Sequence, residues 1–133
     1  MASVLIVDDD SVVCDLLERF VRFAGYEAAS VPDARSALEA MASSARNVVL
    51  CDVHLEDGPG GLWLADRIRE LYPATAMILA TGDVTVPPTE SLRKGVVAYL
   101  VKPFRQADVA LAVRNGVLWA KKESSKRMSR RPS

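Results

Sequence analysis

The chain has 133 residues, half of them apolar and 26% charged, and its 17 basic and 17 acidic side chains cancel. This is the profile of one soluble globular domain with a normal core. No apolar run approaches the length of a membrane span, and residues 1–3 lack the basic start of a signal peptide, so we expect a cytoplasmic protein. One His and two separated Cys residues argue against the common zinc sites, and Cys14 and Cys51 are expected to be buried, reduced thiols.

Short apolar runs alternate with amphipathic segments along the chain. The apolar runs predict five buried strands, at residues 4–7, 27–31, 48–51, 77–80 and 99–101. The amphipathic segments predict five helices, at residues 11–24, 33–41, 62–71, 88–94 and 106 to about 121. Five strand–helix units in alternation predict an α/β fold with a doubly wound parallel sheet and right-handed crossovers. The flavodoxin-like strand order 2-1-3-4-5 is the common solution at this size.

Polar residues that could take part in phosphoryl chemistry follow four of the predicted strands. Asp8-Asp9-Asp10 follows the first strand, Asp52 the third, Thr81 the fourth and Lys102 the fifth. Ligands bind outside the carboxyl ends of the strands in open α/β sheets. Carboxylates, a hydroxyl and an ammonium are therefore expected to converge on one edge of the sheet.

Together with Thr81-Gly82 and Lys102-Pro103-Phe104, these features resemble the receiver (phosphoacceptor) domain of two-component response regulators, the CheY-like family, over roughly residues 3–118. The resemblance implies a signalling protein, which catalyses no more than its own phosphorylation and dephosphorylation. A histidine kinase or histidine phosphotransfer protein would donate the phosphoryl group to Asp52. The resulting conformational change would then control a partner or output, and a phosphorylation-dependent homodimer is one compatible arrangement.

Phosphoryl transfer needs a nucleophile and neutralisation of charge on the phosphoryl oxygens. A carboxylate can act as the nucleophile and form an acyl phosphate, and Asp52 is the candidate because it ends the central strand. Asp8 and Asp9 can form a Mg²⁺ site with Asp52. The resemblance adds the main-chain carbonyl of His54 as a metal ligand. Lys102 supplies a second cation, which can pair with Asp52 at rest and with a phosphoryl oxygen later.

The resemblance also suggests roles at the rim of the site. Thr81 would donate its hydroxyl to a phosphoryl oxygen, and Lys102-Pro103 would form a cis peptide. Tyr99 matches the aromatic switch residue of receivers, although a tyrosine in an apolar strand is also ordinary core. His54 and Asp83 border the approach of a hydrolytic water; they could screen that water, His54 could act as its base, or both side chains could simply be solvated.

The loop from Asp52 to the third helix is one residue longer than the commonest receiver spacing. A haloacid dehalogenase-like phosphatase is the rival hypothesis, because residues 8–12 fit its Asp-x-Asp-x-Thr/Val signature with Asp8 as nucleophile. That family needs further acidic residues on a strand after the lysine, where this chain offers Asp108 and Glu123 and no predicted strand. An adaptor that no longer takes phosphate would be expected to lack the acceptor or the lysine. Asp10 alone has a structural explanation, as a helix N-cap.

The C-terminal segment is strongly basic. Residues 119–133 contain six Lys and Arg residues against one Glu. We expect a receiver domain over residues 1–121 and a disordered basic tail over residues 122–133. A solvated tail is favoured over contact with nucleic acid or a membrane. These 133 residues contain no predicted effector domain, so we expect either a stand-alone receiver or a fragment of a longer protein.

Overall fold

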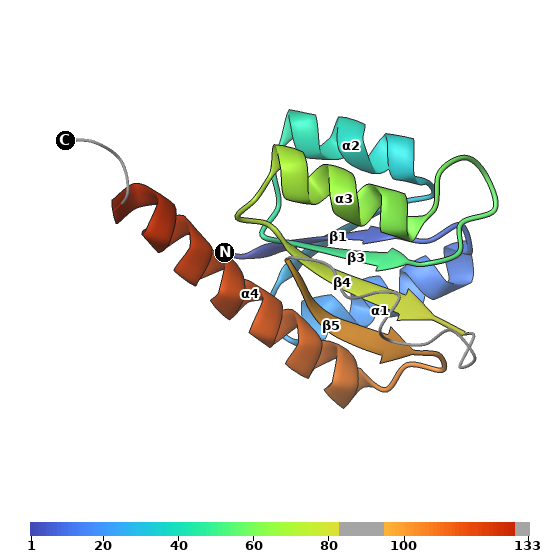
Figure 1. Ribbon diagram of the computed structural model, residues 1–133. Coiled ribbons are helices and arrows are strands. Elements are labelled where there is room, and N and C mark those ends of the chain that lie inside the picture. The colour runs from blue at the N-terminus through green and yellow to red at the C-terminus, as the bar shows by residue number, and fades with distance from the viewer. Residues whose placement is uncertain (83–94, 130–133) are drawn as a thin grey trace.

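The computed structural model describes residues 1–82 and 95–129 (Figure 1). Its five strands are β1 (Ser3–Val7), β2 (Glu27–Val31), β3 (Val48–Asp52), β4 (Ala76–Thr81) and β5 (Val96–Val101). They form one parallel sheet in the order β2-β1-β3-β4-β5, which confirms the predicted flavodoxin-like topology. The phosphoacceptor candidate therefore ends the central strand.

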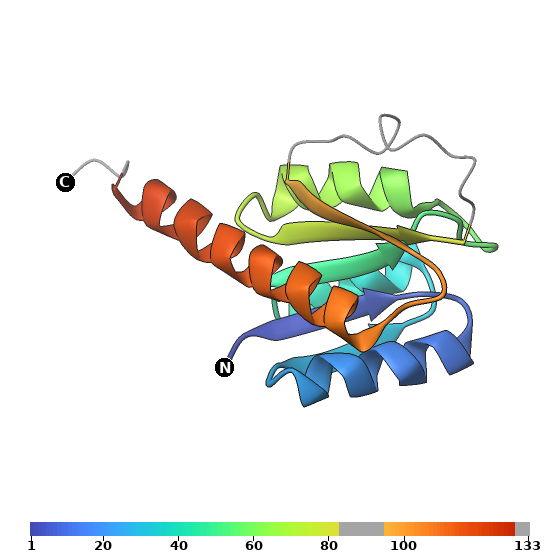
Figure 2. The same ribbon diagram turned by 90° about the horizontal axis from the view of Figure 1, so that it is seen from below.

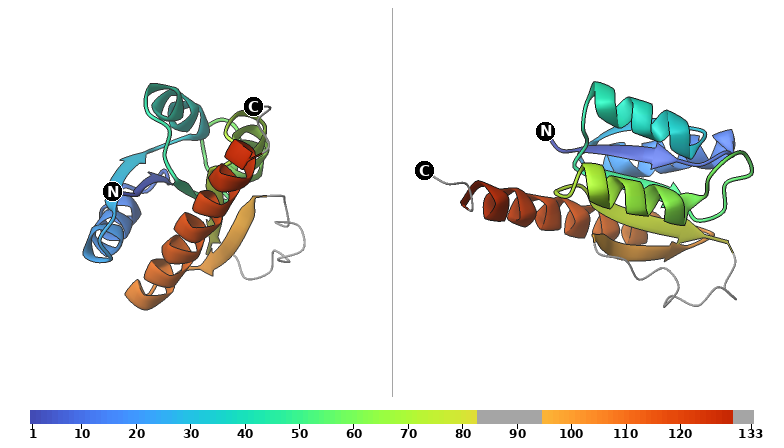
Figure 3. Two further views of the ribbon diagram at one scale, coloured as in Figure 1. Left: turned by 90° about the vertical axis from the view of Figure 1, so that its left-hand side faces the viewer. Right: turned by 45° about the horizontal axis from the view of Figure 1, so that its top comes forward.

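Helices cover both faces of this sheet. They are α1 (Ser11–Phe23), α2 (Ala34–Ser43), α3 (Gly61–Leu71) and α4 (Gln106–Ser129). α1 and α4 pack on one face, and α2 and α3 pack on the other (Figure 3). These four helices occupy predicted positions, and the helix expected at 88–94 lies outside the described residues.

The inner strands β1, β3 and β4 are almost wholly apolar because both of their faces are buried. In β1, Val4 and Ile6 pack with α1 and α4, whereas Leu5 and Val7 pack with α2 and α3. All four side chains are fully buried. A parallel sheet covered on both sides needs such unbroken apolar strands, and this explains why the strand signal in the sequence is a run and not an alternation.

Cys14 and Cys51 are buried and free, as predicted. Cys14 belongs to the core on the α1 side of the sheet and Cys51 to the core on the α2 side. Burial raises the pKa of both thiols above the usual cysteine value, so both stay protonated at neutral pH.

Asp10 caps the first helix. Its side chain accepts hydrogen bonds from the main-chain N–H groups of Val12 at 2.9 Å and Val13 at 3.4 Å. These N–H groups lack partners inside the helix, so a capping carboxylate stabilises it. The structural explanation of Asp10 is confirmed, and the other two acids of the triplet remain for the site.

The last helix is longer than predicted. It was expected to end near Lys121, but α4 continues to Ser129, so the prediction of disorder was wrong for residues 122–129. This stretch contains no Gly or Pro, and Glu123 precedes Lys126 by three residues and Arg127 by four, spacings that favour a helix.

Beyond Ala120, which is buried, the described side chains of α4 are exposed or half-buried. This end of α4 projects past the sheet on the side of the strands' amino ends (Figures 1 and 2). Among the described residues, no helix combines the length and apolar character needed to cross a membrane.

Candidate functional site

The predicted site residues meet at the carboxyl edge of the sheet. Asp52 and Thr81 are the last residues of β3 and β4, while Asp8 and Lys102 directly follow β1 and β5. The main-chain N–H of Lys102 donates to the Thr81 carbonyl at 2.8 Å, which joins two of these strand ends. Asp8, Asp52 and Thr81 are all buried, although each is polar. Buried polar side chains gathered at one sheet edge indicate a functional site.

Lys102 joins the two buried carboxylates. Its Nζ atom donates to Asp52 Oδ2 at 2.7 Å and to Asp8 Oδ2 at 3.2 Å. The side chain of Lys102 is 26% exposed, against 8% for Asp52 and 2% for Asp8. One ammonium therefore offsets two carboxylates, and the buried cluster keeps a net negative charge.

The second oxygen of each carboxylate is bound by the loop that follows it. Asp8 Oδ1 accepts the N–H of Asp10 at 2.9 Å, and Asp52 Oδ1 accepts the N–H of His54 at 2.9 Å. Both bonds span two residues, a local turn that Asp favours. Each carboxylate is thus held at both oxygens, by a neutral amide and by Lys102.

Burial and charge act in opposite directions on the pKa values of this cluster. Burial is the main cause that raises the pKa of Asp8, and it outweighs the Asp10 amide and the Lys102 charge, which lower it. For Lys102, burial acts to lower the pKa, but the hydrogen bond and charge of Asp52, helped by Asp8, raise it overall. The Lys102 side chain is therefore protonated at neutral pH.

Asp9 makes a different contact. Its side chain is exposed, and Oδ2 accepts the main-chain N–H of Glu56 at 2.8 Å. Glu56 belongs to the loop over residues 53–60, between β3 and α3. Sequence reasoning did not identify Glu56, because a main-chain N–H carries no residue signal. The extra loop residue was the one indication that this segment departs from the common pattern.

The loop returns close to the end of β3 at Gly61. The N–H of Gly61 donates to the Val53 carbonyl at 3.0 Å. A Cβ atom at Gly61 would overlap the carbonyl oxygen of Asp52 and lie 2.9 Å from Val53 Cα. Glycine is required here for close approach of the helix to the strand.

No group of three or more His, Cys, Asp or Glu side chains in the described part of the chain is arranged to hold a metal ion. Lys102 links Asp8 to Asp52, and Asp9 binds the loop. The chemistry of the donors nevertheless fits Mg²⁺, which prefers carboxylate and carbonyl oxygens and retains several waters. The three carboxylates of Asp8, Asp9 and Asp52 outnumber the single ammonium of Lys102. A divalent cation would balance the negative charge that remains.

Four other features are predicted at the rim of the site or in β5. The Lys102-Pro103 peptide is cis, as predicted. The side chain of His54 is exposed, and Asp83 lies outside the described residues. Tyr99 is half-buried in β5, and its hydroxyl oxygen is buried with no hydrogen-bond partner in the described structure.

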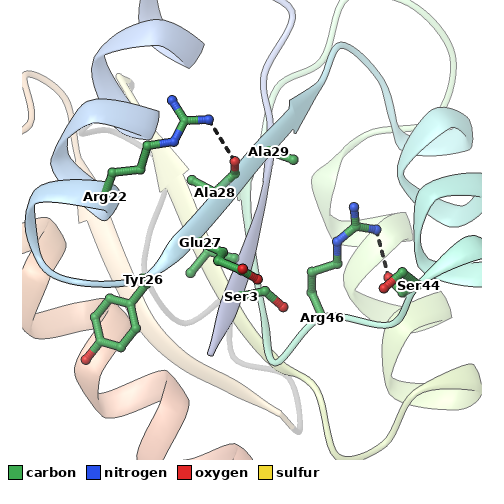
Figure 4. A pocket seen from close by; sticks show the side chains of 9 residues that line it. Ser3, Arg22, Tyr26, Glu27, Ala28, Ala29, Ser44 and Arg46 are labelled. Carbon is green, nitrogen blue, oxygen red and sulfur yellow. Dashed lines mark hydrogen bonds between the residues drawn. The ribbon is translucent and has the colours of Figure 1, made fainter. Parts of the chain in front are cut away.

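Two of the hollows in the described part of the chain bear on the choice of site. One of about 200 Å³ lies beside the site and is lined by residues that include Asp8, Asp9 and Cys14. A larger one, about 520 Å³, lies at the amino ends of β1 and β2, away from these residues (Figure 4). Its arginines already bind main-chain carbonyls: Arg22 donates to Ala28 at 3.0 Å, and Arg46 donates to Ser44 at 2.7 Å. Size alone therefore does not mark the functional site.

Comparison with known proteins identifies the family. The model of the response regulator receiver domain matches residues 4–114. The chain belongs to the response regulator receiver family. This receiver is 35% identical to the transcriptional regulatory protein ZraR of Escherichia coli over 103 residues, which are 77% of this chain and 23% of that protein. It is 36% identical to the response regulator protein FleR of Pseudomonas aeruginosa over 104 residues, 77% of this chain and 22% of that protein.

Solved structures agree with this assignment. NtrX from Brucella abortus superposes with a TM-score of 0.87 at 26% identity, covering 98% of this chain and 30% of that one. A CheY-like receiver domain protein from Methanospirillum hungatei gives a TM-score of 0.83 at 28% identity, covering 92% of this chain and 98% of that one. The receiver spans about a quarter of the length of ZraR and FleR. None of these matches supports the dehalogenase-like alternative, and within the described residues no strand follows β5.

Proposed function

We propose that this receiver accepts a phosphoryl group on Asp52 from a histidine kinase or a histidine phosphotransfer protein, in a Mg²⁺-dependent reaction. The observation that carries the proposal is the buried Asp52 carboxylate at the end of the central strand, with Lys102 Nζ at 2.7 Å. Asp8 is held by the same ammonium at 3.2 Å. Family membership and this arrangement support the same chemistry.

In the reaction, an oxygen of Asp52 attacks the phosphorus in line, and the bond from phosphorus to the donor nitrogen breaks. The His54 amide orients the Asp52 carboxylate through Oδ1. Mg²⁺, bound by Asp8, Asp9, Asp52 and the main-chain carbonyl of His54, would supply charge neutralisation for the phosphoryl oxygens. Lys102 then exchanges its contact with Asp52 for a phosphoryl oxygen.

The conformational response follows from the same contacts. Thr81 and Lys102 hold phosphoryl oxygens and so link the modified site to β4 and β5. Tyr99 lies in β5 with a buried hydroxyl that has no partner among the described residues. An unsatisfied buried hydroxyl costs free energy, and this favours a second position of the ring when the site is phosphorylated.

We propose that this receiver passes on its signal through a contact with another protein. ZraR is named a transcriptional regulatory protein and FleR a response regulator protein, and this chain matches less than a quarter of each. We infer that the phosphorylated receiver changes its contact with an output partner, with a second copy as one arrangement. We do not expect this domain to bind nucleic acid directly.

Labelling with acetyl phosphate and Mg²⁺, followed by intact-mass measurement, tests the proposal. Wild type should gain one labile phosphoryl group, and chelation of Mg²⁺ should prevent it. Asp52→Asn should gain none, whereas Asp10→Asn is the matched control, because Asn caps a helix as well as Asp. A label that persists in Asp52→Asn but disappears in Asp8→Asn would contradict the proposal and support the hydrolase.

A further inference from the structure

We propose that the main-chain N–H of Glu56 positions the Asp9 carboxylate for the divalent cation, which couples the loop over residues 53–60 to cation affinity. The inference rests on the proposed Mg²⁺ site. It assigns a positioning role to a residue whose side chain need not touch the cation.

The contact crosses between two strand ends. Two other hydrogen bonds shape the loop locally: the His54 N–H to Asp52 Oδ1 at 2.9 Å, and the Gly61 N–H to the Val53 carbonyl at 3.0 Å. The Glu56 N–H instead reaches Asp9, 47 residues away in sequence, at 2.8 Å. This bond therefore ties the loop after β3 to the turn after β1.

The nature of the donor matters as much as its position. Asp8 and Asp52 are bound by a charged ammonium, which offsets their charge. The amide of Glu56 is neutral, so it fixes the direction of the Asp9 carboxylate and leaves its negative charge available. Asp9 is exposed, and without the amide its side chain would have to be ordered at the moment of cation binding. Pre-orientation removes that cost.

Coupling of this kind is reciprocal. If the held loop strengthens cation binding, the bound cation must stabilise the loop contact by the same factor. The far end of the loop is fixed where Gly61 packs against the carbonyl oxygen of Asp52. The loop therefore has anchors at both ends, with Glu56 between them, and its length decides whether the amide reaches Asp9.

Two substitutions separate the amide from the side chain. Glu56→Ala removes the carboxylate and keeps the N–H, whereas Glu56→Pro removes both. Mg²⁺ titrations followed by amide NMR should give a Kd about tenfold higher for Glu56→Pro than for Glu56→Ala, the usual loss when a hydrogen-bond partner of a metal ligand is removed. Equal Kd values for the two variants would overturn the inference.

A second measurement needs no proline. In wild type, hydrogen exchange of the Glu56 amide should slow about tenfold on saturation with Mg²⁺, as reciprocity requires. Asp9→Ala should abolish that slowing and speed exchange of this amide without Mg²⁺. Exchange that responds to neither change refutes the coupling, even if Glu56→Pro fails to fold. A wild type that binds no Mg²⁺ instead contradicts the proposed function, and the inference with it.

Discussion

Replacing Gly61 with Ala should disrupt the end of β3 more than any other single methyl group added to the loop. The new Cβ would overlap the Asp52 carbonyl oxygen and lie 2.9 Å from Val53 Cα. Both neighbours are main-chain atoms, so no rotamer change can relieve the overlap. Overpacking costs about 1–3 kcal/mol. We expect the upper end, a loss of about 3 kcal/mol, which lowers the melting temperature by about 12 °C at roughly 4 °C per kcal/mol.

Two other glycines of this edge serve as matched controls. Gly58→Ala meets no atom within 4 Å but has a φ of +77°, so it should lose about 1–2 kcal/mol from backbone strain alone. Gly82→Ala would contact Lys102 Cδ at 3.7 Å, an ordinary packing distance, and should melt close to wild type.

Thermal melts followed by circular dichroism would rank the stabilities of the three variants. Acetyl phosphate labelling at low temperature would measure how fast Asp52 is phosphorylated in each. Folded Gly61→Ala should label more slowly because the helix displaces the Asp52 main chain. If Gly61→Ala melts within about 2 °C of wild type and labels normally, α3 does not pack against the end of β3 as described.

Four further predictions concern the charges. Lys102→Met leaves Asp8 and Asp52 buried without their shared cation, and should destabilise the fold at pH 7 by about 2–4 kcal/mol in urea titrations; no loss of stability would contradict the charge cluster. Burial raises the pKa of Asp8, so the contribution of Asp8 to stability should fall as pH rises from the ordinary value of 3.8 through that raised pKa. Asp8→Asn should lack this fall and melt a few degrees above wild type at pH 7, whereas a lower melting temperature would refute the sign. Deleting residues 123–133 should leave melting and labelling unchanged, because the side chains described there are exposed or half-buried; a loss of several degrees would show docking on the domain. His54→Ala should lose its phosphoryl group faster than wild type if the imidazole screens the attacking water, and more slowly if the imidazole acts as the base for that water; equal decay of the two proteins would exclude both roles.

The sequence was sufficient to predict the sheet and the buried site for a physical reason. Apolar runs that end in Asp52 or Lys102 identify parallel strands, and parallel strands bring their carboxyl ends to one edge. The sequence was insufficient where a main-chain group makes the contact. The identity of residue 56 as glutamate does not indicate that its main-chain N–H binds Asp9. The predicted end of α4 is too early because the charge of residues 122–129 indicates a solvated tail, whereas their lack of Gly and Pro permits a helix.

The projecting end of α4 would magnify any tilt of the packed part of the helix. Residues 121–129 continue the helix past the last buried side chain, Ala120, for about 13 Å at 1.5 Å per residue. A helix is stiff over that length, so a tilt of its packed portion by about 10° would swing the tip through about 2 Å. The packed portion rests against β4 and β5, the strands that carry Thr81 and Tyr99. A small adjustment of those strands would thus be magnified on the opposite side of the molecule, where the tip stands clear of the domain.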